Sequence, residues 1–173
     1  MTTRFARIVE VVANIAIVVV AVVVVGVVAK QYFWRTTSPT RPGVAAGTKL
    51  AVANVDWEQN GATLIVALQS GCHFCSESAP FYQRLVNDTK DKNGLKIVAV
   101  LPQTIDDGKQ YLYSLKVPIA DVKQAQLQTF GVSATPTLIL VDSKGQVVNS
   151  WVGRLTPEAE AEVLQKIKQQ THS

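Results

Sequence analysis

Two cysteines, Cys72 and Cys75, are the residues of this chain whose type and spacing most directly indicate chemistry. They are the only cysteines, so the chain has no framework of structural disulfides. Two intervening residues bring such a pair within disulfide reach across the first turn of a helix. An isolated, closely spaced pair is typical of redox or metal chemistry rather than of a structural staple.

The cysteine pair follows a segment with the pattern of a buried strand. Residues 63–68 (TLIVAL) form a continuous apolar run, Ser70-Gly71 interrupts it, and a helix is predicted to begin near Cys72. Unpaired backbone N–H groups at a helix start favour a thiolate and lower the pKa of its thiol. We therefore predict that Cys72 is the exposed catalytic nucleophile, and that the more buried Cys75 resolves the mixed disulfide.

The spacer residues His73 and Phe74 are candidate redox-tuning positions. An imidazolium at His73 would stabilise the thiolate further and make the disulfide more oxidising. A solvent-facing side chain with little effect on the cysteines is the alternative interpretation.

Other chemistries of a cysteine pair fit this chain less well. A structural zinc site needs four ligands, and the chain offers only the two cysteines with His73 and His172. Covalent haem attachment needs a histidine directly after the second cysteine, where Ser76 stands. An inert structural disulfide stays open. We expect no metal, and no cofactor other than the Cys72–Cys75 disulfide itself.

The rest of the chain after residue 49 alternates strand and helix patterns. The predicted strands are residues 50–55, 63–68, 95–101, 137–141 and 146–152. The predicted helices are one from Cys72 to Asn93-Gly94, kinked at Pro80, and residues 106–115, 123–130 and 157–169, the last capped by Thr156. This order predicts an α/β fold with a mixed sheet and helices on both faces.

The N-terminal region predicts a membrane anchor. Residues 8–29 form an apolar run, interrupted only by Glu10 and Asn14, that is long enough to cross a bilayer as a helix. Tyr32-Phe33-Trp34 follows as an interfacial aromatic belt would. A cleaved signal peptide ending at Val27-Val28-Ala29 is the alternative. The predicted organisation is a short tail (1–7), a transmembrane anchor (8–29), a linker (30–48) and a folded domain (49–173).

The net charge of +4 belongs to the anchor region. Residues 1–48 carry five basic side chains and one acidic side chain, whereas the remaining residues carry twelve of each and are neutral. Basic residues flank the apolar run on both sides, so the charge distribution does not decide the orientation in the membrane. No basic patch with interleaved aromatic residues indicates nucleic-acid binding.

Several separate features of the chain match one family. Pro80 falls five residues after Cys75, Gly131–Thr137 reads GVSATPT, a turn follows at Asp142–Gly145, and Trp151-Val152-Gly153 closes the pattern. With the strand–CxxC–helix order, residues 49–170 resemble the thioredoxin superfamily, and more narrowly its membrane-anchored TlpA/ResA-like thiol–disulfide oxidoreductases.

The resemblance implies a thioredoxin-like fold and a cis Thr135–Pro136 bond facing the CxxC. Thr135 and Pro136 would then bind substrate, because the backbone before the proline can pair with an extended peptide. The implied protein is a single-pass membrane enzyme, monomeric, with its soluble domain outside the cytoplasm in the periplasm. It would act on protein thiols or disulfides, principally as a reductant supplied with electrons by a redox partner protein.

Two positions depart from the family pattern. Val66 stands where thioredoxins often carry a buried acid, with Glu77 an uncertain substitute, and Gly71 replaces the tryptophan that commonly precedes the first cysteine. A binding module with a structural disulfide remains an alternative. So does a peroxiredoxin-like peroxidase, although Gln69 is not the Ser or Thr that such an enzyme carries three residues before its reactive cysteine.

Overall fold

The computed structural model describes residues 20–22, 24, 43–52, 55–90 and 94–171. The chain divides into two units, Met1–Pro39 and Thr40–Ser173. In the first unit, residues 20–22 and 24 are helical, and the rest of the predicted anchor (8–29) lies outside the described residues. Among the described residues, no helix is both long enough and apolar enough to cross a membrane.

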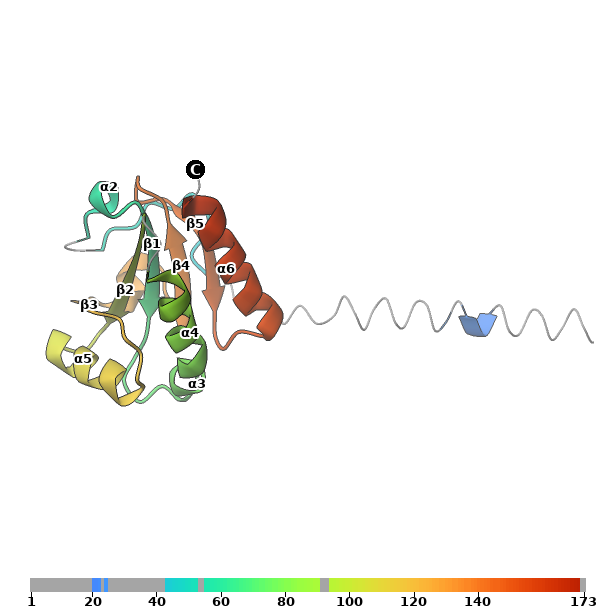
Figure 1. Cartoon of the computed structure of the whole chain (residues 1–173), viewed down its shortest axis with the longest axis horizontal. Helices are drawn as coiled ribbons and strands as arrows, with labels where there is room; N and C mark the ends of the chain where they lie inside the picture. The colour runs from blue at the N-terminus through green and yellow to red at the C-terminus, as the bar shows by residue number, and fades with distance from the viewer. Residues whose placement is uncertain (1–19, 23, 25–42, 53–54, 91–93, 172–173) are drawn as a thin grey trace, which may run out of the picture. The chain divides into compact units, whose positions relative to one another are not determined.

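The second unit is built on a five-stranded mixed sheet with the order β3-β2-β1-β4-β5 (Figure 1). The strands are β1 (Ala62–Ala67), β2 (Leu95–Leu101), β3 (Asp121–Gln124), β4 (Thr137–Val141) and β5 (Val147–Val152). The central β1 pairs in parallel with β2 and antiparallel with β4. The predicted mixed sheet is therefore confirmed, and β2 and β4 have the bounds predicted from the sequence.

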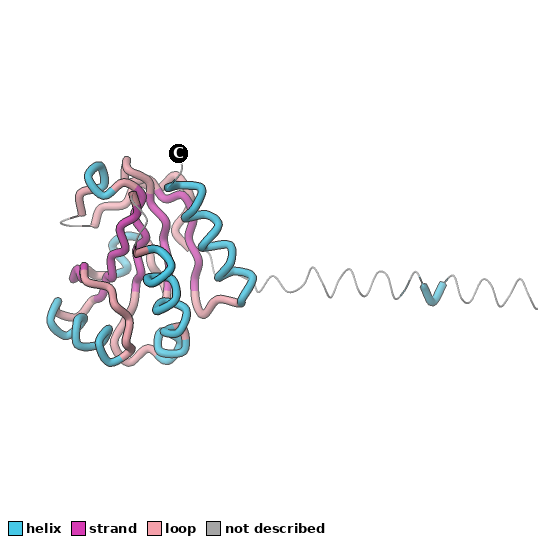
Figure 2. The backbone as a smooth tube through the Cα atoms, in the orientation of Figure 1, coloured by secondary structure: helices cyan, strands magenta, loops and turns pink. Residues whose placement is uncertain are grey.

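Helices precede, connect and follow these strands (Figure 2). They are α2 (Trp57–Asn60), α3 (His73–Glu77), α4 (Ala79–Thr89), α5 (Ile105–Ser114), the 3₁₀ helix η1 (Leu127–Phe130) and α6 (Pro157–Thr171). The predicted cap of α6 is confirmed, because the hydroxyl of Thr156 accepts a hydrogen bond from the Ala159 N–H at 3.4 Å. Hydrogen bonds from its own backbone amide and from Thr156 lower the pKa of Glu158 in the same turn.

The helix predicted after Cys72 is divided into α3 and α4 at Ser78. Pro80 lies in the first turn of α4. It lacks an N–H group and its ring would clash inside a continuous helix, whereas both properties are tolerated in a first turn. The predicted kink is thus a break between two helices, and α4 ends at Thr89, before the predicted Asn93-Gly94.

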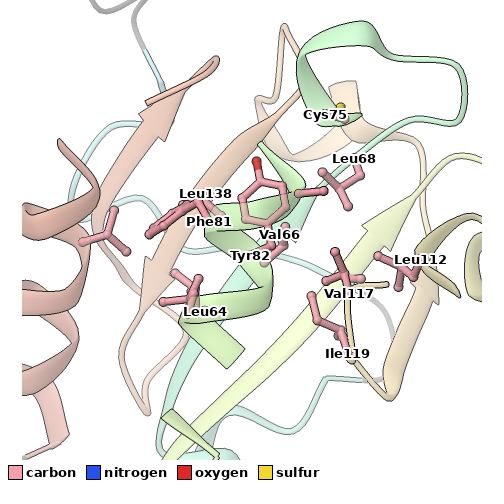
Figure 3. Packing of buried hydrophobic residues seen from close by; sticks show 14 of the residues in the cluster. Leu64, Val66, Leu68, Cys75, Phe81, Tyr82, Leu112, Val117, Ile119 and Leu138 are labelled. Carbon is pink, nitrogen blue, oxygen red and sulfur yellow. The ribbon is translucent and has the colours of Figure 1, made fainter. Parts of the chain in front are cut away.

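The two faces of the sheet carry separate apolar clusters. Alternate residues of β1 serve them, with Leu64 and Val66 in one cluster and Ile65 and Ala67 in the other. The first cluster includes side chains of α4, α5 and α6, some of which are shown in Figure 3. The second is covered by residues 44–52, η1 and α2. The prediction of helices on both faces is therefore correct, but the three longer helices, α4, α5 and α6, share one face and only the short η1 and α2 lie on the other.

The strand predicted over residues 50–55 is wrong for the described residues 50–52. Only the neighbouring Lys49 forms an isolated antiparallel bridge, with Gln146. Leu50 and Val52 are buried in the second cluster while Ala51 between them is exposed. The buried side chains of this segment therefore pack onto the face of the sheet although residues 50–52 form no strand.

The helix predicted over residues 123–130 is also wrong at its start. Residues 121–124 form β3, which pairs in parallel with the edge of β2, and only η1 remains helical. The pairing satisfies backbone groups that β2 would otherwise leave open, and it buries Val122 against the first cluster. Gly108 of α5 permits this packing, since an added Cβ there would lie 3.0 Å from Val122.

Candidate functional site

The cysteine pair lies where the central strand ends. All six residues of β1 are buried, and Leu68 continues the strand direction by donating its N–H to the carbonyl of Val100 at 3.0 Å. Gly71 then adopts a φ of 78°, a left-handed conformation that favours glycine. This turn brings Cys72 to the start of α3, as the sequence pattern predicted.

Cys72 and Cys75 form a disulfide with their Cα atoms 5.2 Å apart. Cys75 is fully buried, whereas Cys72 is partly exposed. The N–H of Cys75 donates to Cys72 Sγ at 3.2 Å, so the sulfur serves as the N-cap of α3. The same donor can stabilise a negative charge on Cys72 once the disulfide is reduced. The predicted difference in exposure is confirmed, while the roles of nucleophile and resolving cysteine stay predictions.

The Thr135–Pro136 bond is cis, as the resemblance implied. The carbonyl oxygen of Thr135 lies 3.5 Å from Cys72 Sγ, which places the loop directly beside the disulfide. Pro136 is buried and its carbonyl accepts the N–H of Gly153 at 2.7 Å. Ser133 is exposed and Thr135 is partly exposed, so this loop reaches the surface beside the disulfide.

The two spacer residues point away from the core. The side chain of His73 is 77% exposed, and Phe74 is 54% exposed. Their rings meet edge to face with centroids 5.6 Å apart. Phe74 therefore places an exposed apolar side chain beside the disulfide. The proposed tuning roles of both residues stay predictions.

Glu77 connects α3, the helix that carries the CxxC, to the loop that follows β5. Its carboxylate accepts a hydrogen bond from Nη1 of Arg154 at 3.1 Å, and its other oxygen lies 3.2 Å from Nε2 of His73. The four-residue spacing of His73 and Glu77 on one helix face is visible in the sequence. The contact with Arg154 has no sequence signal, and Arg154 was not predicted as part of the site.

The interior behind the disulfide is apolar. Val66 is fully buried, so the position that holds an acid in many thioredoxins is an aliphatic side chain in an apolar cluster. Cys75, Val66, Leu68 and Tyr82 belong to this cluster (Figure 3). Burial raises the pKa of Tyr82 far above its ordinary value, against a smaller opposing effect of a hydrogen bond with Ser78. Tyr82 therefore stays neutral and offers no base to Cys75.

No group of three or more His, Cys, Asp or Glu side chains that could hold a metal ion occurs in the part of the chain that the structure describes. His172, a ligand considered for zinc, lies outside the described residues. The site within them therefore consists of the disulfide, the cis-proline loop and the Glu77 contacts.

This fold and site define a class of protein. The thioredoxin-like domain family matches residues 50–168, and the chain belongs to that family. Over 100 residues it is 34% identical to the thiol-disulfide oxidoreductase ResA of Bacillus thuringiensis (strain Al Hakam), and equally to that of Bacillus anthracis. The match covers 56% of this chain and 57% of each relative, so the chain spans little more than half the length of these curated relatives.

Solved structures share the fold at lower sequence identity. A structure described as a thiol:disulfide interchange protein DsbE from Chlorobium tepidum superposes with a TM-score of 0.57 at 22% identity, covering 75% of this chain and 98% of that chain. A thiol-disulfide isomerase from Corynebacterium glutamicum gives 0.52 at 14% identity, covering 76% and 96%. At these identities the likeness establishes the fold.

Proposed function

We propose that this chain is a thiol–disulfide oxidoreductase that exchanges its Cys72–Cys75 disulfide with the thiols and disulfides of other proteins. One observation carries the proposal. The partly exposed Cys72 sulfur accepts the Cys75 amide at 3.2 Å and lies 3.5 Å from the carbonyl of Thr135, while Cys75 is buried beneath it. The names of the curated relatives support the same activity.

The reaction in the reducing direction begins with the dithiol form. The Cys72 thiolate attacks one sulfur of a substrate disulfide, which forms a mixed disulfide and releases the other substrate sulfur as a thiolate. Cys75, deprotonated, then attacks Cys72 Sγ and releases the second substrate sulfur. Two electrons have passed to the substrate and the Cys72–Cys75 disulfide has formed. A dithiol redox partner protein must reduce that disulfide before the next cycle.

The cis-proline loop gives the reaction its orientation. An extended substrate can pair with the backbone of Thr135, which brings the substrate disulfide to Cys72 rather than to Cys75. Exposed Phe74 adds apolar contact at the same edge. Pro136 shapes the loop from its buried position and keeps the Thr135 carbonyl beside the sulfur.

We further propose that residues 8–29 anchor the enzyme in a membrane with its folded domain outside the cytoplasm, where it acts as a reductant. The length and apolarity of the run support the anchor. Disulfide-bonded protein substrates are found outside the cytoplasm, which supports the location. Protease treatment of intact cells or spheroplasts tests it, because cleavage of the folded domain without lysis is expected.

The activity is tested by trapping. In the full chain, Cys75→Ser removes the resolving thiol, so mixed disulfides between Cys72 and substrate proteins should accumulate and disappear on addition of a reductant. The matched control is Cys72→Ser, which retains Cys75 but should trap nothing because Cys75 is buried. If Cys75→Ser forms no adducts and the Cys72→Ser protein still reduces insulin disulfides, the oxidoreductase proposal is wrong.

A further inference from the structure

Glu77 holds a negative charge between two basic side chains at the edge of the site. Its carboxylate contacts Nε2 of His73 at 3.2 Å with one oxygen and Nη1 of Arg154 at 3.1 Å with the other. Both functional oxygens of Glu77 are thus engaged by partners from different parts of the chain.

These contacts join the two halves of the proposed site. His73 is covalently next to Cys72 on α3, whereas Arg154 follows Gly153 in the loop after β5. Gly153 in turn donates its N–H to Pro136 at 2.7 Å. Glu77 therefore contributes a negative charge to the balance of charge between the CxxC helix and the segment that is hydrogen-bonded to Pro136.

That balance acts on one redox form of the disulfide more than on the other. The oxidised pair is uncharged, whereas the reduced pair carries a negative charge when Cys72 is the thiolate that the proposed reaction requires. Positive charges nearby favour the thiolate and so the reduced form, which makes a disulfide a stronger oxidant. A negative charge acts in the opposite sense. Because the buried Val66 is aliphatic, no acid at that position opposes the effect of Glu77 and Arg154 on Cys72.

We propose that Glu77 is a positioning residue that lowers the reduction potential of the Cys72–Cys75 disulfide, by holding a negative charge against His73 and Arg154. The inference rests on the proposed oxidoreductase function and adds a direction to it. Glu77 makes the pair a better reductant than a CxxC with a histidine spacer would otherwise be.

A purely mechanical role for the Glu77–Arg154 pair makes a different prediction. If the ion pair only fastens the loop to α3, removing either partner breaks the same contact and has the same consequence. If the charges act on the thiolate, removing Glu77 and removing Arg154 shift the potential in opposite directions. The sign of the two effects therefore separates the two roles.

The measurement is the equilibrium of the full chain, in detergent, with glutathione. In this reaction the protein disulfide and two glutathione thiols give the protein dithiol and one glutathione disulfide. We expect Glu77→Gln to raise the equilibrium constant about fivefold and Arg154→Gln to lower it about fivefold, each ~20 mV at roughly 30 mV per tenfold change. The double variant should return to within about twofold of the wild type, since the two charge changes oppose each other.

Glu160→Gln is the matched control. Glu160 forms an ion pair with Arg84 at 2.6 Å and its side chain is 24% exposed, compared with 33% for Glu77. This pair joins α4 to α6 rather than the two parts of the site, so its loss should leave the equilibrium unchanged. An equal shift in Glu160→Gln would overturn the inference, because any surface acid would then have the same effect.

Salt provides a second readout. At about 1 M ionic strength the Debye length contracts to ~3 Å, so the difference between Glu77→Gln and wild type should shrink. Shifts of the same sign in Glu77→Gln and Arg154→Gln, or no shift in either, contradict the role of Glu77 and leave the oxidoreductase proposal intact. Failure of Cys75→Ser to trap substrates contradicts the function itself, whatever the equilibrium constants are.

Discussion

The two parallel strands at the centre of the sheet, β1 and β2, end at the same edge and are each followed by a helix with a side-chain cap. Ala67 and Val100 pair near that edge. After β1, Cys72 Sγ accepts the N–H of Cys75 at 3.2 Å; after β2, Thr104 Oγ1 accepts the N–H of Asp107 at 3.2 Å. At both strand-to-helix junctions, the side chain before the helix accepts the N–H of the residue three positions later, but the capping atom is sulfur in one and oxygen in the other.

The first turns of the two helices differ in charge. That of α5 carries Asp106 and Asp107, and the Thr104 hydroxyl also donates to the Asp107 carboxylate at 2.6 Å. That of α3 carries no acidic side chain. Acids in a first turn satisfy helix N–H groups and stabilise the helix. The first turn of α3 has no such acid, so its N–H donors are left to the sulfur of Cys72. The start of α5 thus serves stability, whereas the start of α3 is available for chemistry.

Of the changes to the two helix starts, replacing the capping sulfur of Cys72 should have the largest effect on activity. Serine is itself a good N-cap, so Cys72→Ser should keep α3 in place while removing the nucleophile. We expect insulin-disulfide reduction to fall by roughly a thousandfold or more, because no other exposed thiol can attack. Circular dichroism against wild type in the reduced form should show an unchanged fold. Substantial residual activity would mean that Cys72 is not the nucleophile.

Giving α3 the acidic first turn of α5 should have a smaller effect. Phe74→Glu places a carboxylate in that turn, where it competes for the N–H donors and repels a thiolate on Cys72. We expect the reduced protein to react with iodoacetamide, which is uncharged, about fivefold more slowly at neutral pH.

Two controls identify the cause of that change. Phe74→Gln removes the same ring without adding charge and should react at nearly the wild-type rate. Ile105→Glu adds an acid to the first turn of α5 and should leave the cysteine unaffected. Equal slowing in Phe74→Glu and Phe74→Gln would assign the effect to the lost ring instead.

The sequence was sufficient for those parts of the site that local patterns specify. A continuous apolar run, a Ser-Gly break and a CxxC predict a buried strand, a turn and an exposed and a buried cysteine, all of which the structure has. The cis bond at Thr135–Pro136 followed from the family resemblance and not from the residues alone. Pro80 predicted a disturbance in the helix correctly, but not that the helix would divide there.

The parts that were missed depend on contacts between distant residues. Residues 121–124 have no strong strand pattern and become β3 because the edge of β2 offers backbone partners. Arg154 reaches Glu77 across 77 positions, a proximity that only the folded sheet creates. Leu50 and Val52 are buried on either side of an exposed residue, as in a strand. However, they pack on the face of the sheet and do not pair with its edge.

Weakening the Thr104 cap of α5 should have the smallest effect, and it should leave the reactivity of Cys72 unchanged. Thr104→Ala removes both the bond from the Asp107 amide and the bond to its carboxylate, so the free energy of unfolding should fall by about 1 kcal/mol. Thr104→Ser keeps the hydroxyl and should recover most of that loss in urea titrations. The iodoacetamide rate of reduced Cys72 should match wild type in both variants, because the two caps belong to separate helices. A slower rate in Thr104→Ala would show instead that the two helix starts are coupled through the contact between their loops, where the N–H of Ser70 donates to the Gln103 side chain at 3.4 Å.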